Sequence, residues 1–116
     1  MATRSRIAIK LNDHEETGND YYLSIYVHYD GMDVGHVLKN HYSDFDVAFK
    51  IVTGGDISYI TEKEIKYYKD LGDSWEVVQP NESQSLEALF KLANESDAQF
   101  LNIYQDGEWQ EIKLGC

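Results

Sequence analysis

Cysteine, proline and basic residues are scarce in this chain of 116 residues. Its one cysteine excludes the intrachain disulfide framework that staples many small secreted domains. Ten Lys and Arg oppose 21 Asp and Glu, which gives a net charge of −11 with the histidines neutral. That balance disfavours a nucleic-acid partner, because binding phosphates requires clustered cations. Apolar runs also stay well below the roughly 18 residues of a membrane span, so we expect no membrane partner.

Apolar and aromatic residues are nevertheless abundant. Hydrophobic residues make up 42% of the chain and aromatic residues 13%, nine of them Tyr. Disordered acidic segments lack this content because they cannot bury enough apolar surface to fold. The length and the absence of linkers or repeats predict one folded domain over residues 1–116.

Periodicity predicts the order of the elements. Residues 4–11 and 21–29 alternate as strands, and residues 33–53 change to helical spacing with a bend at Ser43, where Asp33 and Ser43 are candidate N-caps. We expect a strand or an irregular segment at 56–60. Residues 64–69 fit a strand or one helical turn, and the strand is favoured because a hairpin turn at 71–74 would join it to a strand at 75–79, which Pro80 ends. A helix capped by Ser83 or Ser85 and a hairpin turning at Asp106-Gly107 follow.

These elements predict an α+β fold. The order β-β-α-α-β-β-α-β-β implies an antiparallel-rich sheet of about five to six strands, with the helices packed mainly on one face. If they cover the face of Ile7 and Ile25, the opposite face exposes Tyr22, Tyr26 and His28. Exposed tyrosines are enriched at interfaces, whereas half-buried strand residues are the alternative interpretation. A homodimer that covers this face is a further alternative.

The candidate binding residues lie on the second strand and the helix after it. They are Tyr22, Tyr26, His28, Asp30, His36 and His41. A metal site built from the histidines is disfavoured, because five residues on a helix separate His36 from His41 by about 140°. We therefore expect neither a metal nor another cofactor.

Catalysis is also disfavoured. His28 with Asp30 or Asp33 would form an oriented imidazole–carboxylate pair, the minimum for general-base work. A turn position explains Asp30 and an N-cap explains Asp33 equally well. No serine or internal cysteine stands in a nucleophile motif, and neither a phosphate loop nor a GxGxxG motif occurs. We assign no catalytic residue, and a small hydrolase is the least favoured alternative.

The acidic residues are concentrated in the last third. Residues 70–116 contain ten carboxylates and two lysines, a net charge of −8. Such a stretch is either a solvated face or a surface that meets a basic partner.

Four blocks in the first 60 residues resemble a known family. They are an MATRSRIAI start, an IYVHYDG segment, a VGHVLKNHY helix and a GDIS segment. In this order they resemble small tailed-bacteriophage (T-even-type) accessory proteins, with Tyr29 where that family usually has Trp. The family carries no established activity, so the resemblance implies a context only: a phage-encoded protein in the cytoplasm of the infected bacterial host.

From these features we expect a non-catalytic protein that binds or modulates a host or phage protein, one with a basic surface. The alternative is a small-ligand or nucleotide-signal binding protein that uses the region of Tyr26, His28 and Asp30. Aromatic side chains there could stack on bases, although the acidic balance disfavours phosphates.

Overall fold

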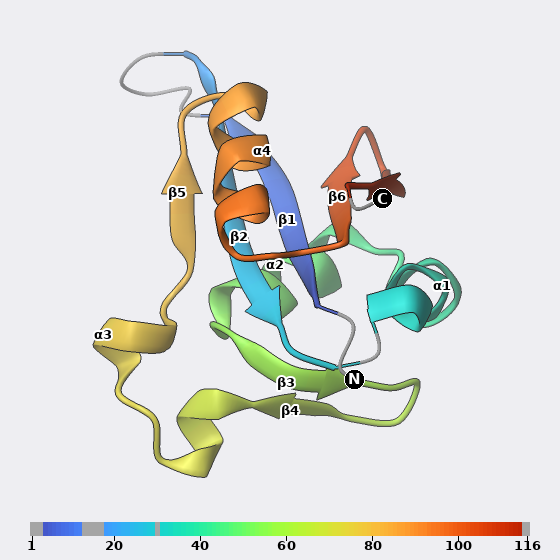
Figure 1. Ribbon diagram of the computed structural model, residues 1–116. Helices are drawn as coiled ribbons and strands as arrows, with labels where there is room; N and C mark the ends of the chain where they lie inside the picture. The colour runs from blue at the N-terminus through green and yellow to red at the C-terminus, as the bar shows by residue number, and fades with distance from the viewer. Residues whose placement is uncertain (1–3, 13–17, 30, 115–116) are drawn as a thin grey trace.

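The computed structural model describes residues 4–12, 18–29 and 31–114, without the side chains of Gly31 and Met32. Along the chain its elements are β1 (Ser5–Asn12), β2 (Asp20–Val27), α1 (Gly31–His41), α2 (Phe45–Thr53), β3 (Ile57–Ile60), β4 (Ile65–Tyr67), the 3₁₀ helix η1 (Tyr68–Leu71), α3 (Trp75–Val78), β5 (Asn81–Ser83), α4 (Leu86–Glu95), β6 (Phe100–Gln105) and β7 (Glu108–Lys113). They are labelled in Figure 1.

The sheet is mixed and has seven strands. Its order is β4-β3-β2-β1-β6-β7, and β5 pairs with β2 beside this path. β1 runs antiparallel to β2 but parallel to β6, and β2 runs parallel to β3. The α+β class is confirmed, whereas the predicted antiparallel-rich sheet of five to six strands is wrong, as is its order of elements. Helices lie between β2 and β3 and just before β6, and such crossovers return a chain in the same direction for parallel pairing.

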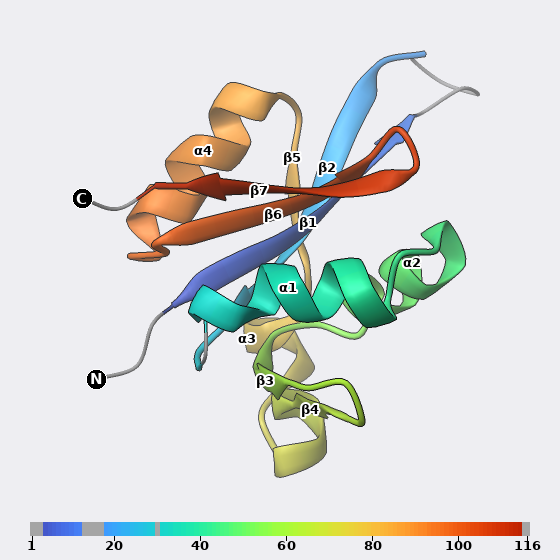
Figure 2. The same cartoon turned by 90° about the vertical axis from the view of Figure 1, so that its right-hand side faces the viewer.

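Helices cover both faces of the sheet, as Figure 2 shows. α1 and α2 pack on one face, where Val34, Leu38 and Ile51 join Ile7 and Ile25 in the larger core. α4 covers the other face, where Leu89 packs with Ala8, Tyr22, Leu101 and Ile103. The face predicted to be exposed is therefore partly closed by α4.

The segment between β4 and α4 departs from the prediction. Residues 75–79 do not form a strand: the Ser74 carbonyl accepts hydrogen bonds from the amides of Val77 and Val78, so the chain makes one helical turn there. The predicted hairpin turn at 71–74 is instead the end of η1, with Gly72 at φ 97°. The strand of this segment is β5, which follows Pro80. It pairs with β2 at Tyr22–Ser24, whereas β3 pairs with β2 at Val27.

The helix ends differ from the predicted caps at two of three places. Asp33 lies in the first turn of α1, which begins at Gly31, and Asp44 holds the N-cap position of α2. Ser43 instead donates its hydroxyl to the Leu38 and Lys39 carbonyls, so it satisfies the end of α1. Ser85 caps α4 as predicted, accepting from the Ala88 amide at 3.1 Å.

The C-terminal hairpin agrees with the prediction. Asp106 and Gly107 have φ values of 54° and 82°, the left-handed conformation that a two-residue turn of this type requires. The turn joins β6 to β7 in the register Gln105↔Glu108.

Candidate functional site

The predicted binding residues of β2 lie in different environments. Tyr22 is 7% exposed and packs beneath α4, so its ring is part of the core. Tyr26 and His28 are half-buried, and the Tyr26 hydroxyl lies 3.0 Å from His28 Nδ1. The Tyr29 ring packs edge-on against His28, with centroids 4.3 Å apart. Asp30 lies outside the described residues, so the structure brings together only Tyr26 and His28 of this group.

Two ionisable groups adjoin Tyr26: Arg6 lies opposite it in β1, and Asp56 lies at its amide. Arg6 is 2% exposed, and burial lowers the pKa of its guanidinium to about 10. Asp56 accepts a 2.8 Å hydrogen bond from the Tyr26 amide, and burial raises the pKa of its carboxyl above the usual range. Burial also raises the pKa of the Tyr26 hydroxyl. Within the described residues, no carboxylate contacts the His28 ring, so the structure shows no imidazole–carboxylate pair there.

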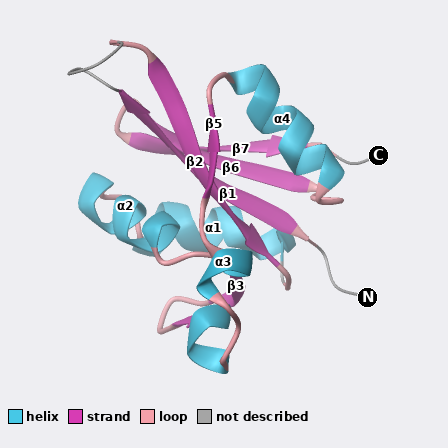
Figure 3. Cartoon of the chain, turned by 90° about the vertical axis from the view of Figure 1, so that its left-hand side faces the viewer, coloured by secondary structure: helices cyan, strands magenta, loops and turns pink. Residues whose placement is uncertain are grey.

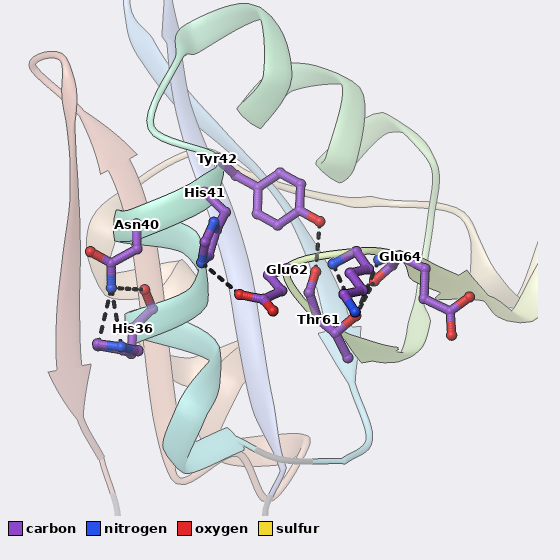
Figure 4. A network of polar contacts seen from close by, with 8 residues as sticks. His36, Asn40, His41, Tyr42, Thr61, Glu62 and Glu64 are labelled. Carbon is purple, nitrogen blue, oxygen red and sulfur yellow. Dashed lines mark hydrogen bonds and ion pairs between the residues drawn. The ribbon is translucent and has the colours of Figure 1, made fainter.

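His36 and His41 line one open cavity of about 410 Å³ between α1 and the turn that joins β3 to β4. Asp33 and Glu62 line it as well, and His41 Nε2 lies 3.3 Å from Glu62 Oε2. Figure 4 shows the His36 ring against Asn40, whose amide donates to the His36 carbonyl at 2.9 Å. Despite this gathering, the described residues contain no group of three or more His, Cys, Asp or Glu arranged to hold a metal ion.

A second cavity, of about 350 Å³, lies on the other side of Tyr42 between α2 and β4. The Tyr42 hydroxyl donates a 2.6 Å hydrogen bond to the Thr61 carbonyl, which ties the α1–α2 connection to the β3–β4 turn (Figure 4). Val47, Ile51 and Ile65 form apolar walls of this cavity, and Lys50 and Lys63 line it with their charged side chains. No local sequence pattern predicts this cavity, because its walls come from separate segments, residues 42–51 and 63–67.

The third feature is the stretch Lys69–Val77, called here the η1–α3 surface. All nine of its residues are exposed. Three are large and apolar: Leu71 at 53%, Trp75 at 45% and Val77 at 77% exposed. Asp73 and Glu76 stand between them in the sequence, and Asp70 precedes Leu71. In Figure 3 this stretch lies at the end of the molecule beside β3, away from α4.

Trp75 is positioned by its neighbours. A Cβ on Gly55 would lie 2.9 Å from the Trp75 ring, so only glycine lets the ring approach this closely. The Lys69 ammonium lies 5.8 Å from the centroid of the ring. The alternation of apolar and acidic residues at 70–77 is the sequence signal that could have indicated this surface. Because a strand was predicted at 75–79, Trp75 and Val77 were expected to be core residues.

Among the described residues, no helix is long and apolar enough to cross a membrane. No protein-family model matches this chain, and neither a curated protein nor a solved structure is detectably similar to it.

Proposed function

We propose that this protein is a non-catalytic binding protein that docks through the η1–α3 surface onto a host or phage protein with a basic surface. The observation that carries the proposal is the row of exposed apolar side chains at Leu71, Trp75 and Val77, flanked by carboxylates. A phage-encoded modulator in the cytoplasm of the infected host is the context in which we expect it to act.

The chemistry of this surface is that of an interface. Hot-spot residues supply most of the binding energy at interfaces and are enriched in Trp, so Trp75 is the expected anchor, and Leu71 and Val77 add apolar area around it. Trp75 is already held between Gly55 and Lys69, so little rotamer freedom remains for docking to remove.

The surrounding charge selects the partner. Asp70, Asp73 and Glu76 are exposed, and none forms an ion pair within the described residues. Carboxylates on the rim of an apolar patch favour a basic partner, and the net charge of −11 steers such a partner toward the protein.

The test is affinity capture from phage-infected cells with matched variants. The wild-type protein should retain a specific partner at low salt, and Leu71→Ser/Val77→Ser should lose it. The control is Leu86→Ser on α4, where an apolar side chain is 40% exposed outside the η1–α3 surface. Thermal melts of each variant establish that the fold is kept.

Charge is tested separately with the captured partner in purified form. Asp73→Lys/Glu76→Lys should slow association, and raising the salt concentration should slow wild-type association in the same way. The proposal is contradicted if no specific partner is captured, or if the partner binds the serine double variant as well as the wild type.

A further inference from the structure

The cavity between α2 and β4 combines apolar walls with unpaired positive charge. It has a volume of about 350 Å³, within the range of small-molecule sites. Val47, Ile51 and Ile65 supply aliphatic surface, and the rings of Tyr42 and Tyr67 supply aromatic surface. No residue of the η1–α3 surface lines this cavity, although the Lys69 ammonium lies 5.0 Å from the centroid of the Tyr67 ring.

The cavity is built from positions that the fold holds in place. Tyr42 is fixed by its 2.6 Å hydrogen bond to Thr61, as Figure 4 shows. Tyr67 packs against Gly54 so closely that a Cβ there would lie 2.3 Å from its ring. The two aromatic walls are therefore preorganised, which lowers the entropy cost of binding a ligand between them.

The charge of the cavity is opposite to that of the chain. Lys50 and Lys63 line it, and neither ammonium forms an ion pair within the described residues. The one acid in its lining, Glu64, accepts a 2.6 Å hydrogen bond from the Tyr59 hydroxyl. In a protein of net charge −11, two unpaired lysines beside an apolar cavity favour an anion with an apolar body.

We propose that this cavity binds a small aromatic carboxylate, with its ring against the aliphatic walls and its carboxylate between Lys50 and Lys63. The Tyr67 side chain also lines the cavity, and its hydroxyl makes no hydrogen bond to another described residue. Burial raises the pKa of Tyr67, so the hydroxyl keeps its proton at neutral pH. The site shares no lining residue with the protein-docking surface.

The test uses phenylacetate as the probe and phenylacetamide as its neutral isostere. Titration of the ¹⁵N-labelled protein should give saturable NMR shifts at the amides of residues 47–51 and 63–67. A dissociation constant on the order of 1 mM suits a probe with this few atoms. The amide should bind at least about tenfold more weakly, because it lacks the charge that pairs with the lysines.

Variants locate the site and separate charge from shape. Lys50→Gln/Lys63→Gln should weaken phenylacetate binding about tenfold, and added salt should weaken wild-type binding in the same direction. Val47→Phe should fill the cavity and abolish the shifts. Lys91→Gln, an exposed lysine of α4, should change nothing.

Three outcomes would overturn the proposal. The first is no saturable shift with phenylacetate, the second is equal binding of phenylacetamide, and the third is a set of shifts that lies outside the two predicted segments. Because the lysines are exposed, the glutamine variants keep the test decisive even if Val47→Phe fails to fold.

Discussion

Arg6 donates a 2.8 Å hydrogen bond from Nη2 to Oδ1 of Asn81, 75 residues further along the chain. The same guanidinium donates to the Ser24 hydroxyl at 3.0 Å and to the Ser96 hydroxyl at 3.1 Å. One buried cation therefore links β1 to β2, to β5 and to the C-terminal end of α4. Its partners are neutral oxygens, so the hydrogen bonds, more than an ion pair, offset the cost of burying the charge.

Arg6→Lys should destabilise the protein by about 2–4 kcal/mol. A lysine cannot reach three elements at once, and the buried Ser24 hydroxyl would lose the hydrogen bond from the guanidinium. Arg4→Lys is the matched control, two residues away on the same chain segment. Among the described residues, the Arg4 side chain makes only a surface pair with Asp97 at 3.4 Å, so its change should stay within about 1 kcal/mol. Urea denaturation of both variants measures the difference, and equal losses would contradict this role for Arg6.

Asp56 should make stability depend on pH. Burial raises its pKa in the folded protein above the value of 3.8 for an unperturbed carboxyl, so folding favours the protonated form. Its contribution is therefore present below pH 3.8 and is lost as pH rises through the folded pKa. Relative to wild type, Asp56→Asn should gain stability as pH rises from 3.8 and then level off.

The asparagine keeps an oxygen for the Tyr26 amide, so the variant changes charge with little change of shape. Asp73→Asn, at an exposed position, should leave the slope unaltered. Denaturation at a series of pH values measures the effect, and a wild-type slope that Asp56→Asn preserves would refute it.

Tyr42→Phe should cost about 0.5–1.5 kcal/mol, the range for one hydrogen bond, because it removes the bond to the Thr61 carbonyl. It should also loosen the turn that separates the two cavities, which faster amide exchange at residues 61–64 would report. Tyr21→Phe is the control, since that hydroxyl has no hydrogen bond among the described residues. A loss of stability equal to that of the control would argue against the contact.

Gly35→Ala should destabilise α1 against β6 and β7 by about 1–2 kcal/mol, although alanine favours helix. A Cβ there would lie 2.2 Å from Glu111 Oε2 and 2.8 Å from Oδ1 of the buried Asn102. Adding Glu111→Ala should restore part of the loss, because the Glu111 side chain is exposed and its removal frees space. If Gly35→Ala alone is as stable as the wild type in chemical denaturation, the close approach of α1 to Glu111 and Asn102 is disproved.

Local patterns predicted the N-cap of α4 and the C-terminal turn correctly, but not the caps at Asp33 and Ser43 or the strand at 75–79. Ser85 and the Asp106-Gly107 turn act through bonds to nearby residues, so their sequence signals were sufficient. The α+β class followed in the same way. The pairing of β1 with β6 was not predicted, because parallel partners are separated by crossover connections whose course no local pattern records.

The candidate site was likewise predicted from the sequence only in part. His36 and His41 were singled out from the sequence, and they do line a common cavity, but Lys50, Lys63 and Tyr67 were not. The aromatic face of β2 was predicted without knowledge of α4, which buries Tyr22. Trp75 looked like a strand residue because apolar character alone does not distinguish a core side chain from an exposed one.

The acidic charge and the aromatic content follow from composition alone, and the strand and helix periodicity follows from the order of neighbouring residues. Only the tertiary structure decided which charges are buried and which apolar groups are exposed. Arg6 and Arg4 show why: they differ by two positions in one short segment, yet one is enclosed by β5 and α4 and the other reaches solvent. That difference comes from elements some 75 to 90 residues away, whose contacts depend on how the whole chain packs.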